Sequence, residues 1–176
     1  MKSKVCEDLE RSAVRGQPLF RVAYADADFS GAKLRTARLP GVRFTRCKLD
    51  FSDLTEAYLP RAVFDECVIN DAQFSGTYLR GARFVKCKFR NANLYGANLA
   101  EAVFEDCDIM ATDLSYTEFS EASLRNCRLK NCKAFLADFT NVQPQWLNGI
   151  QDEIREALLP PGFTPVAANA HVKKKT

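Results

Sequence analysis

The chain reads FTRCKLDFSDLTEAYLPRAV from residue 44 to residue 63, with a large apolar residue at every fifth position. In this stretch the positions are Phe44, Leu49, Leu54 and Leu59. The same spacing extends from Tyr24 to Phe139, and 23 of its 24 positions hold Leu, Ile, Phe or Tyr. A small residue, most often Ala or Cys, stands two positions before each of them. A period kept over this length predicts a repeat architecture.

A period of five fits neither a helix nor a single strand. A helix buries positions i, i+3, i+4 and i+7, whereas a strand buries every second residue. Five residues advance a helix by about 500°, so each repeat would fall about 140° from the last. In an extended segment the small and the large residue are two apart and point to the same side. We therefore expect short extended segments joined by corners, in a coil with these side chains inside.

Runs such as ADFSG (27–31), ANLYG (92–96), ANLAE (97–101) and ADFTN (137–141) resemble the units of pentapeptide-repeat proteins. The resemblance covers residues 22–142 without an insertion. It implies an all-β fold, a right-handed quadrilateral parallel β-helix with four pentapeptides per coil. The 24 repeats would then form about six coils.

Residues 20 apart support this coil size independently. Cysteines stand at positions 47, 67, 87, 107 and 127, and phenylalanines at 44, 64, 84 and 104. Between them the charge alternates in one series, Arg46, Glu66, Lys86 and Asp106. Opposite charges on adjacent strands stabilise a sheet by roughly 0.2–1 kcal/mol per pair. The spacing predicts that Cys67 and Cys87 lie on one wall of the coil, on neighbouring turns.

The charge of the repeat region is balanced. The whole chain has a net charge of +3, while residues 22–142 hold 16 Lys and Arg against 16 Asp and Glu. Basic and acidic residues come in bands, which is typical of pairing between neighbouring coils. A nucleic-acid site would need a continuous basic stripe, and only Lys173, Lys174 and Lys175 in the tail form a small basic patch. We therefore expect no direct binding of nucleic acid.

The positions of the cysteines and the lack of long apolar runs lead us to expect a cytoplasmic location. Six of the seven cysteines occupy the small inward position, which favours burial as structural thiols. Disulfides or a metal site are the alternative, but parallel Cβ vectors suit a disulfide poorly and a line of thiols cannot converge on a tetrahedral metal. Free thiols suit a reducing compartment. No run of 18 apolar residues and no apolar signal segment in residues 1–20 is present.

The two ends of the chain differ from the repeats. Residues 1–21 are expected to form an N-terminal cap, with Val5, Leu9 and Ala13 at helical spacing. Residues 143–166 are expected to form a helix to about Leu159 and then an extended segment, and residues 167–176 a disordered basic tail. The C-terminal segment either covers the last coil or joins two molecules, and its candidate contact residues are Trp146, Leu147, Ile150, Ile154, Leu158, Phe163 and Val166.

The residues with reactive side chains form no catalytic pattern. The single histidine, His171, lies in the tail, and the inward cysteines have no histidine partner to activate them. No phosphate-binding loop and no cluster with metal-ligand spacing is present. We expect no enzyme, no cofactor and no metal.

One exposed surface is a candidate for binding a partner. Ala134 interrupts the apolar series, and either Phe135 and Leu136 or the C-terminal segment could fill the space. If these two residues instead point outward, they share one face with Tyr95 and Tyr116 and form an aromatic patch. Tyr58 and Tyr78, 20 apart, are expected to stack on each other.

Two functions are compatible with these features. The first is a non-enzymatic interaction or scaffold module with an unidentified protein partner. The second follows from the resemblance, since some pentapeptide-repeat proteins imitate duplex DNA, bind DNA gyrase, protect it from quinolones and dimerise through a C-terminal helix. Two features differ from that group: the rod is neutral rather than acidic, and the projecting loops of its plasmid-borne members are missing.

Overall fold

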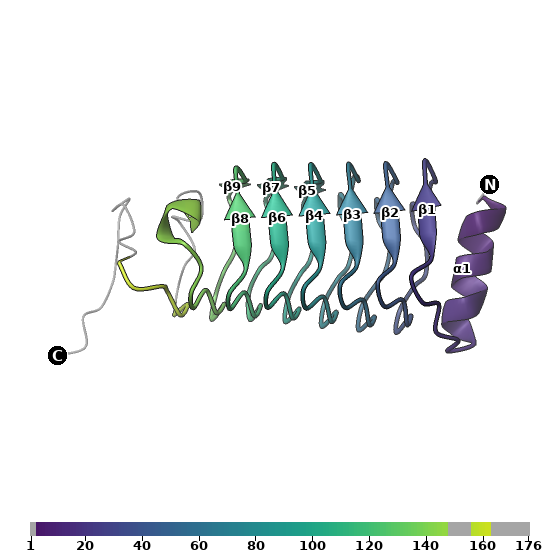
Figure 1. The fold of residues 1–176 in the computed structure, drawn as a ribbon, viewed down its shortest axis with the longest axis horizontal. Helices are drawn as coiled ribbons and strands as arrows, with labels where there is room; N and C mark the ends of the chain where they lie inside the picture. Colours follow the sequence, from purple (N-terminus) through teal and green to yellow (C-terminus); the bar gives the residue numbers. More distant parts are fainter. Residues whose placement is uncertain (1–2, 148–155, 163–176) are drawn as a thin grey trace.

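A computed structural model describes residues 3–147 and 156–162 of the chain. The repeats form a rod-shaped β-solenoid in which the strands of successive coils lie side by side (Figure 1). A helix lies at the N-terminal end of the rod, and the last described residues lie at the other end. The all-β solenoid predicted from the period of five is confirmed.

Two walls of the rod are parallel sheets whose strands are three residues long. The first wall has the order β1-β2-β3-β4-β6-β8, and the second has the order β5-β7-β9. Phe44 in β2 pairs with Phe64 in β3, and Phe64 pairs with Phe84 in β4, so partners are 20 residues apart. The bounds are β1 Ala23–Ala25, β2 Arg43–Thr45, β3 Val63–Asp65, β4 Arg83–Val85, β5 Lys88–Arg90, β6 Val103–Glu105, β7 Asp108–Met110, β8 Ser123–Arg125 and β9 Arg128–Lys130.

The other two walls are held by isolated parallel bridges with the same spacing. The third wall begins with the pair Lys33 and Asp53, and the fourth begins with the pair Arg38 and Tyr58. Each bridge joins residues 20 apart, as in the two sheets. Four pentapeptides therefore complete one turn of the chain.

The corners between walls have a left-handed backbone. Every fifth residue from Arg21 to Asn141 has a φ between 49° and 67°, and most of these residues are not glycine. For a residue other than glycine, this conformation costs roughly 1–2 kcal/mol of conformational energy. Hydrogen bonds to the next coil compensate; for example, the Arg46 amide donates to the Asp65 carbonyl at 2.7 Å. Glycine occupies only five of these corners, at positions 31, 41, 76, 81 and 96, so the fold requires the conformation but not the glycine.

The inside of the rod is filled by stacked side chains. The Phe64 and Phe84 rings are parallel with centroids 4.8 Å apart, and the Phe84 and Phe104 rings are 4.6 Å apart. All four phenylalanines of this column are at most 1% exposed. Such stacking follows from the 20-residue spacing, since identical rings on neighbouring coils lie one above another.

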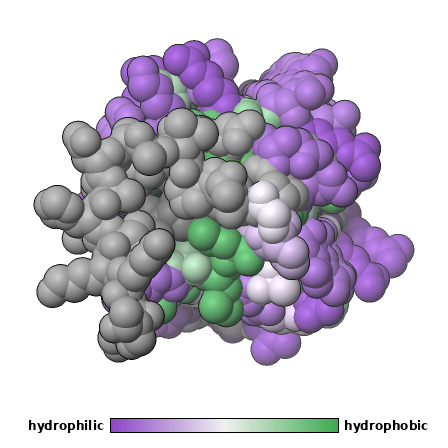
Figure 2. All heavy atoms as spheres, turned by 90° about the vertical axis from the view of Figure 1, so that its left-hand side faces the viewer, coloured by the Kyte–Doolittle hydropathy of each residue, from purple (hydrophilic) through white to green (hydrophobic). Residues whose placement is uncertain are grey.

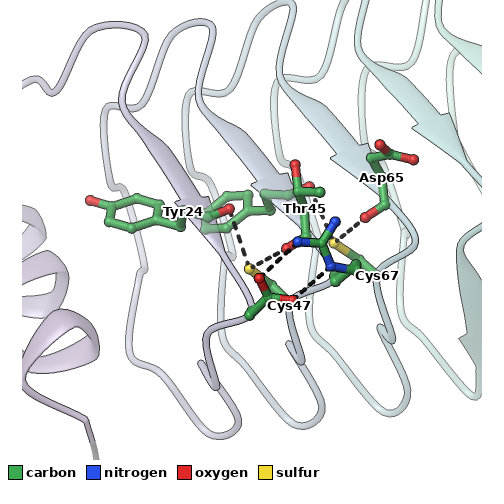
Figure 3. Close-up of polar contacts among 8 residues, drawn as sticks. Tyr24, Thr45, Cys47, Asp65 and Cys67 are labelled. Atoms are coloured by element: carbon green, nitrogen blue, oxygen red, sulfur yellow. Dashed lines mark hydrogen bonds and ion pairs between the residues drawn. The ribbon is translucent and has the colours of Figure 1, made fainter.

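The cysteine column lies beside the phenylalanines, and its thiols are unpaired. The Cys67 thiol donates a hydrogen bond to the Phe44 carbonyl at 3.4 Å, and the Cys47 thiol makes the same contact with Tyr24 of the preceding coil (Figure 3). The six cysteines of the repeats form no disulfide among the described residues, and Cys127 alone of the six is partly exposed. Burial raises the pKa of the Cys132 thiol, which lies on the third wall. These thiols pack as small apolar groups that also satisfy backbone carbonyls of the coil before them.

The N-terminal end of the rod is covered by α1, Lys4–Val14. Ser3 caps this helix, since its side chain accepts a hydrogen bond from the Cys6 amide at 3.2 Å. Cys6, Leu9 and Ala13 are buried in the core cluster. Val5, one of the three residues at helical spacing, is 44% exposed, because the buried stripe of the helix runs through Cys6 at position i−3 from Leu9.

The C-terminal end differs from the predicted helix. A short 3₁₀ helix, η1, spans Pro144–Leu147. Leu158, which was predicted to lie on a helix, instead forms a parallel bridge with Asp138 on the fourth wall. The backbone of Glu156 has a φ of 58°, as do corner residues. Ala157 and Leu159 pack against the core, so the chain returns to the repeat pattern one coil after residues 136–139.

Ala134 points into the rod like the larger residues of its series, and the two residues that follow it do not fill the space beside it. Ala134 is fully buried, whereas Phe135 and Leu136 are 36% and 40% exposed. These two residues therefore do not turn inward to fill the space. Leu147 in η1 is fully buried in the same core cluster.

Candidate functional site

Three aromatic rings form a continuous exposed strip on the third wall of the rod. The Tyr95 and Tyr116 ring centroids are 5.0 Å apart, and the Tyr116 and Phe135 centroids are 5.5 Å apart. The exposed fractions are 47% for Tyr95, 46% for Tyr116, 36% for Phe135 and 40% for Leu136. We call these four residues the aromatic ridge. The structure thus brings together the residues that the sequence singled out.

The three rings come from two adjacent positions of the 20-residue coil. Tyr95 and Phe135 are 40 residues apart and therefore occupy the same slot two coils apart, while Tyr116 is a corner residue of the coil between them. Ser115, which has the slot between Tyr95 and Phe135, is only 7% exposed. The Tyr116 ring contacts both outer rings. The ridge therefore spans three coils on a rigid backbone.

The candidate contact residues at the C-terminus separate into two groups. Leu147 is fully buried in its own chain and serves as part of the cap. Leu158 is 61% exposed at the end of the fourth wall. In Figure 2, which views this end of the rod, a small group of hydrophobic atoms is visible near the centre, with hydrophilic atoms to its right. The Trp146 side chain and Ile150, Ile154, Phe163 and Val166 lie outside what the structure describes.

Charged side chains at the first corner form pairs between coils, as the alternation of charge predicted. Two nitrogens of the Arg46 guanidinium donate to the two carboxylate oxygens of Asp26, each at 2.7 Å. These hydrogen bonds lower the pKa of the Asp26 carboxyl. Lys86 lies 3.6 Å from Glu66, and further along the same series Asn126 donates to Asp106 at 3.2 Å. Much of the acidic charge on this corner is therefore neutralised locally.

A groove with a volume of about 710 Å³, which was not predicted from the sequence, lies between the fourth and the first wall. Four arginines and one glutamate line it, so its formal charge is +4 − 1 = +3. We call it the arginine groove; its lining residues are Phe20, Arg21, Ala23, Pro40, Gly41, Arg43, Tyr58, Pro60, Arg61, Val63, Tyr78, Arg80, Gly81 and Glu101. Only Arg21 and Arg61 share a position within the 20-residue coil, so the repeat spacing alone would have pointed to two of the four arginines.

The described residues show no site for metal chemistry. Within residues 3–147 and 156–162, no group of three or more His, Cys, Asp or Glu side chains could hold a metal ion. In the same part of the chain, no helix has the length and apolar character needed to cross a membrane. The surfaces that remain are the aromatic ridge, the arginine groove and the C-terminal end.

The fold defines a repeat protein of the β-solenoid class. The family model described as a pentapeptide repeat region matches residues 18–86 and 79–145. Because these matches cover well over half of the chain, it belongs to the pentapeptide-repeat family. No curated protein sequence matched it.

Three solved structures are among those to which this chain is similar. HetL, involved in heterocyst differentiation regulation in the cyanobacterium Nostoc sp. strain PCC 7120, is 24% identical with a TM-score of 0.53, over 83% of this chain and 75% of HetL. QnrB1, a plasmid-mediated fluoroquinolone resistance protein, is 20% identical with a TM-score of 0.38, over 84% of each chain. Rfr23 from the cyanobacterium Cyanothece 51142 is 18% identical with a TM-score of 0.30, over 74% of this chain and 99% of Rfr23. At these identities the similarity concerns the fold.

Proposed function

We propose that this protein is a non-enzymatic interaction module that binds a protein partner through the aromatic ridge. The observation that carries the proposal is the continuous contact of Tyr95, Tyr116 and Phe135 on an exposed wall. Exposed aromatic residues in a contiguous patch are typical of protein interfaces. Tyrosine also contributes a hydroxyl at little cost in conformational entropy, which favours its use as an anchor.

The rigidity of the rod supports this function. Tyr116 is fixed at a corner whose amide donates to the Phe135 carbonyl at 2.8 Å. Its ring is held between two neighbours, so little side-chain freedom is left to lose when a partner binds. A preorganised strip of this kind suits recognition by shape.

Replacement of the ridge is expected to abolish partner binding without unfolding the rod. In the variant Tyr95→Ser, Tyr116→Ser, Phe135→Ser and Leu136→Ser, all four changes are at exposed positions. Hot-spot aromatic residues typically contribute about 2 kcal/mol or more each to binding, so the combined loss should exceed a hundredfold in affinity. The measurement is quantitative affinity capture with the wild type, followed by titration of each captured partner against the variant.

A matched control removes exposed apolar surface elsewhere. Phe51 is 66% exposed and Val14 is 85% exposed, and neither belongs to the ridge. Phe51→Ser with Val14→Ser should retain every partner that the ridge variant loses. Equal capture by wild type and ridge variant, with both folded by circular dichroism, would rule out the ridge as the binding surface.

The second candidate is protection of DNA gyrase, which rests on membership of the family and on the resemblance to its topoisomerase-protecting members. The charge pattern is less favourable, because acidic side chains such as Asp26 and Glu66 are paired with Arg46 and Lys86. A gyrase supercoiling assay with ciprofloxacin tests it. A protective protein restores supercoiling when it is present at the concentration of the enzyme, and no restoration at that ratio removes this candidate.

A further inference from the structure

The arginine groove is a second surface, on the corner between the fourth and first walls in the N-terminal half of the rod. Its corner series is Arg21, Gly41, Arg61, Gly81 and Glu101, one residue per coil. Arg43, at the start of β2, adds a guanidinium from the neighbouring wall. Coils stack about 4.8 Å apart, so the four steps of this series extend over roughly 19 Å.

Among the described residues, three of the four arginines have no carboxylate within ion-pair distance. Arg80 is paired with Glu101 at 2.5 Å, at the C-terminal end of the groove. No ion pair within residues 3–147 and 156–162 involves Arg21, Arg43 or Arg61, and all three are exposed. This contrasts with the first corner, where Arg46 and Lys86 both have carboxylate partners. The positive charge of the groove is therefore concentrated between Arg21 and Arg61.

The backbone is shaped to hold two of these side chains along the groove. A Cβ atom added at Gly41 would lie 3.2 Å from Cγ of Arg21, and one added at Gly81 would lie 3.5 Å from Cγ of Arg61. Each arginine side chain thus passes over the glycine of the following coil. The alternation of arginine and glycine allows the aliphatic parts of the Arg21 and Arg61 side chains to lie close to the backbone and along the rod.

The rest of the lining decides which kind of anion fits. Tyr58 and Tyr78 are stacked on each other with centroids 5.2 Å apart, and the Arg38 guanidinium lies over the Tyr58 ring at 6.0 Å. Both faces of the Tyr58 ring are therefore occupied, so it offers no face on which a nucleobase could stack.

The apolar lining residues favour a peptide. Phe20, Pro40 and Pro60 occupy one slot in three successive coils, and Phe20 is 69% exposed. An apolar strip beside unpaired guanidinium groups complements a chain that has both carboxylates and an apolar side chain.

We propose that the arginine groove binds an acidic peptide segment of a partner protein, in extended conformation and with an apolar residue toward Phe20. Arg21, Arg43 and Arg61 donate to its carboxylates, since a guanidinium can bind a carboxylate through two parallel hydrogen bonds. A groove of about 19 Å accommodates roughly six residues at 3.3 Å per residue. The pair of Arg80 and Glu101 marks the end at which a further carboxylate is no longer favoured.

Fluorescence anisotropy with the full chain tests the proposal. The probe is a fluorescein-labelled hexapeptide of five glutamates and one leucine, with a glutamine version and a labelled oligothymidylate hexamer as comparisons. The wild type should bind the glutamate peptide saturably, with affinity that falls as salt rises, and should bind the other two more weakly. The double variant Arg43→Gln and Arg61→Gln should bind about tenfold more weakly, because two charge-assisted hydrogen-bonding groups are lost.

The control variant has the same net charge but leaves the groove intact. Arg90 on β5 and Arg128 on β9 are exposed and do not line it. Arg90→Gln with Arg128→Gln should bind the glutamate peptide within twofold of the wild type. Equal weakening in both variants would show a general charge effect, tighter binding of the oligothymidylate would make the groove a nucleic-acid site, and absence of saturable peptide binding would reject the groove; each overturns the proposal. Loss of ridge-dependent capture has no bearing on this assay.

Discussion

Phe84→Ala is expected to lower the free energy of unfolding by about 3–5 kcal/mol, the usual cost of removing a fully buried phenylalanine. Phe84 is fully buried, and its ring stacks on Phe64 and on Phe104 in the two adjacent coils. It also contacts the Phe89 ring, with centroids 5.4 Å apart. The stacked coils above and below cannot close the cavity without breaking their backbone hydrogen bonds, so little relaxation is available.

Urea unfolding followed by circular dichroism measures this change. A matched control is Phe51→Ala, since Phe51 lies at a corner and is 66% exposed. The control should alter the free energy of unfolding by less than about 0.5 kcal/mol. If both variants were destabilised to a similar extent, the phenylalanine column would not be the core of the rod.

Leu147→Ala is expected to lower the free energy of unfolding by about 2–4 kcal/mol, because this side chain is fully buried at the C-terminal end. Leu147 is part of the core cluster of its own chain, so the loss should not depend on protein concentration. Thermal unfolding at several protein concentrations, together with light scattering, makes the measurement. A loss that grows on dilution would show that Leu147 stabilises a dimer instead.

Leu158→Ala is the matched control for the cap. Leu158 is 61% exposed although its backbone is bridged to Asp138. Its truncation should leave the stability of a single chain nearly unchanged. Homodimerisation through the C-terminal segment remains a prediction, and a fall in solution mass on Leu158→Ala would support it.

Sequence reasoning predicted the body of the rod well because every contact there repeats. The main-chain partners of Phe64 are Phe44 and Phe84, and all three positions obey one arithmetic rule. The same rule predicted the pairing of Glu66 with Lys86 and the stacking of Tyr58 on Tyr78. In a solenoid each coil contacts only its neighbours, so a period in the sequence translates directly into contacts in space.

The ends of the rod were predicted less well, because a cap has no repeat to confirm it. The spacing of Val5, Leu9 and Ala13 indicated a helix, but α1 buries Cys6 rather than Val5. Apolar residues from Trp146 to Leu158 suggested one helix, yet Leu158 extends a wall. The apolar residues of this segment have helical spacing, but Ala157 and Leu159 also occupy the small and the large position of a further pentapeptide repeat. A short apolar pattern is compatible with both structures, and only packing on the last coil distinguishes them.

The amino-acid sequence by itself determined the coil of four pentapeptides, the filling of its interior and the pairing of charges along the first corner, because each depends on residues a fixed number apart. Only the tertiary structure decided the arginine groove. Arg21 and Arg61 belong to a corner series, Arg43 to the first wall and Arg80 to the fourth. No single period connects them, and they meet because the chain turns between two walls at that edge.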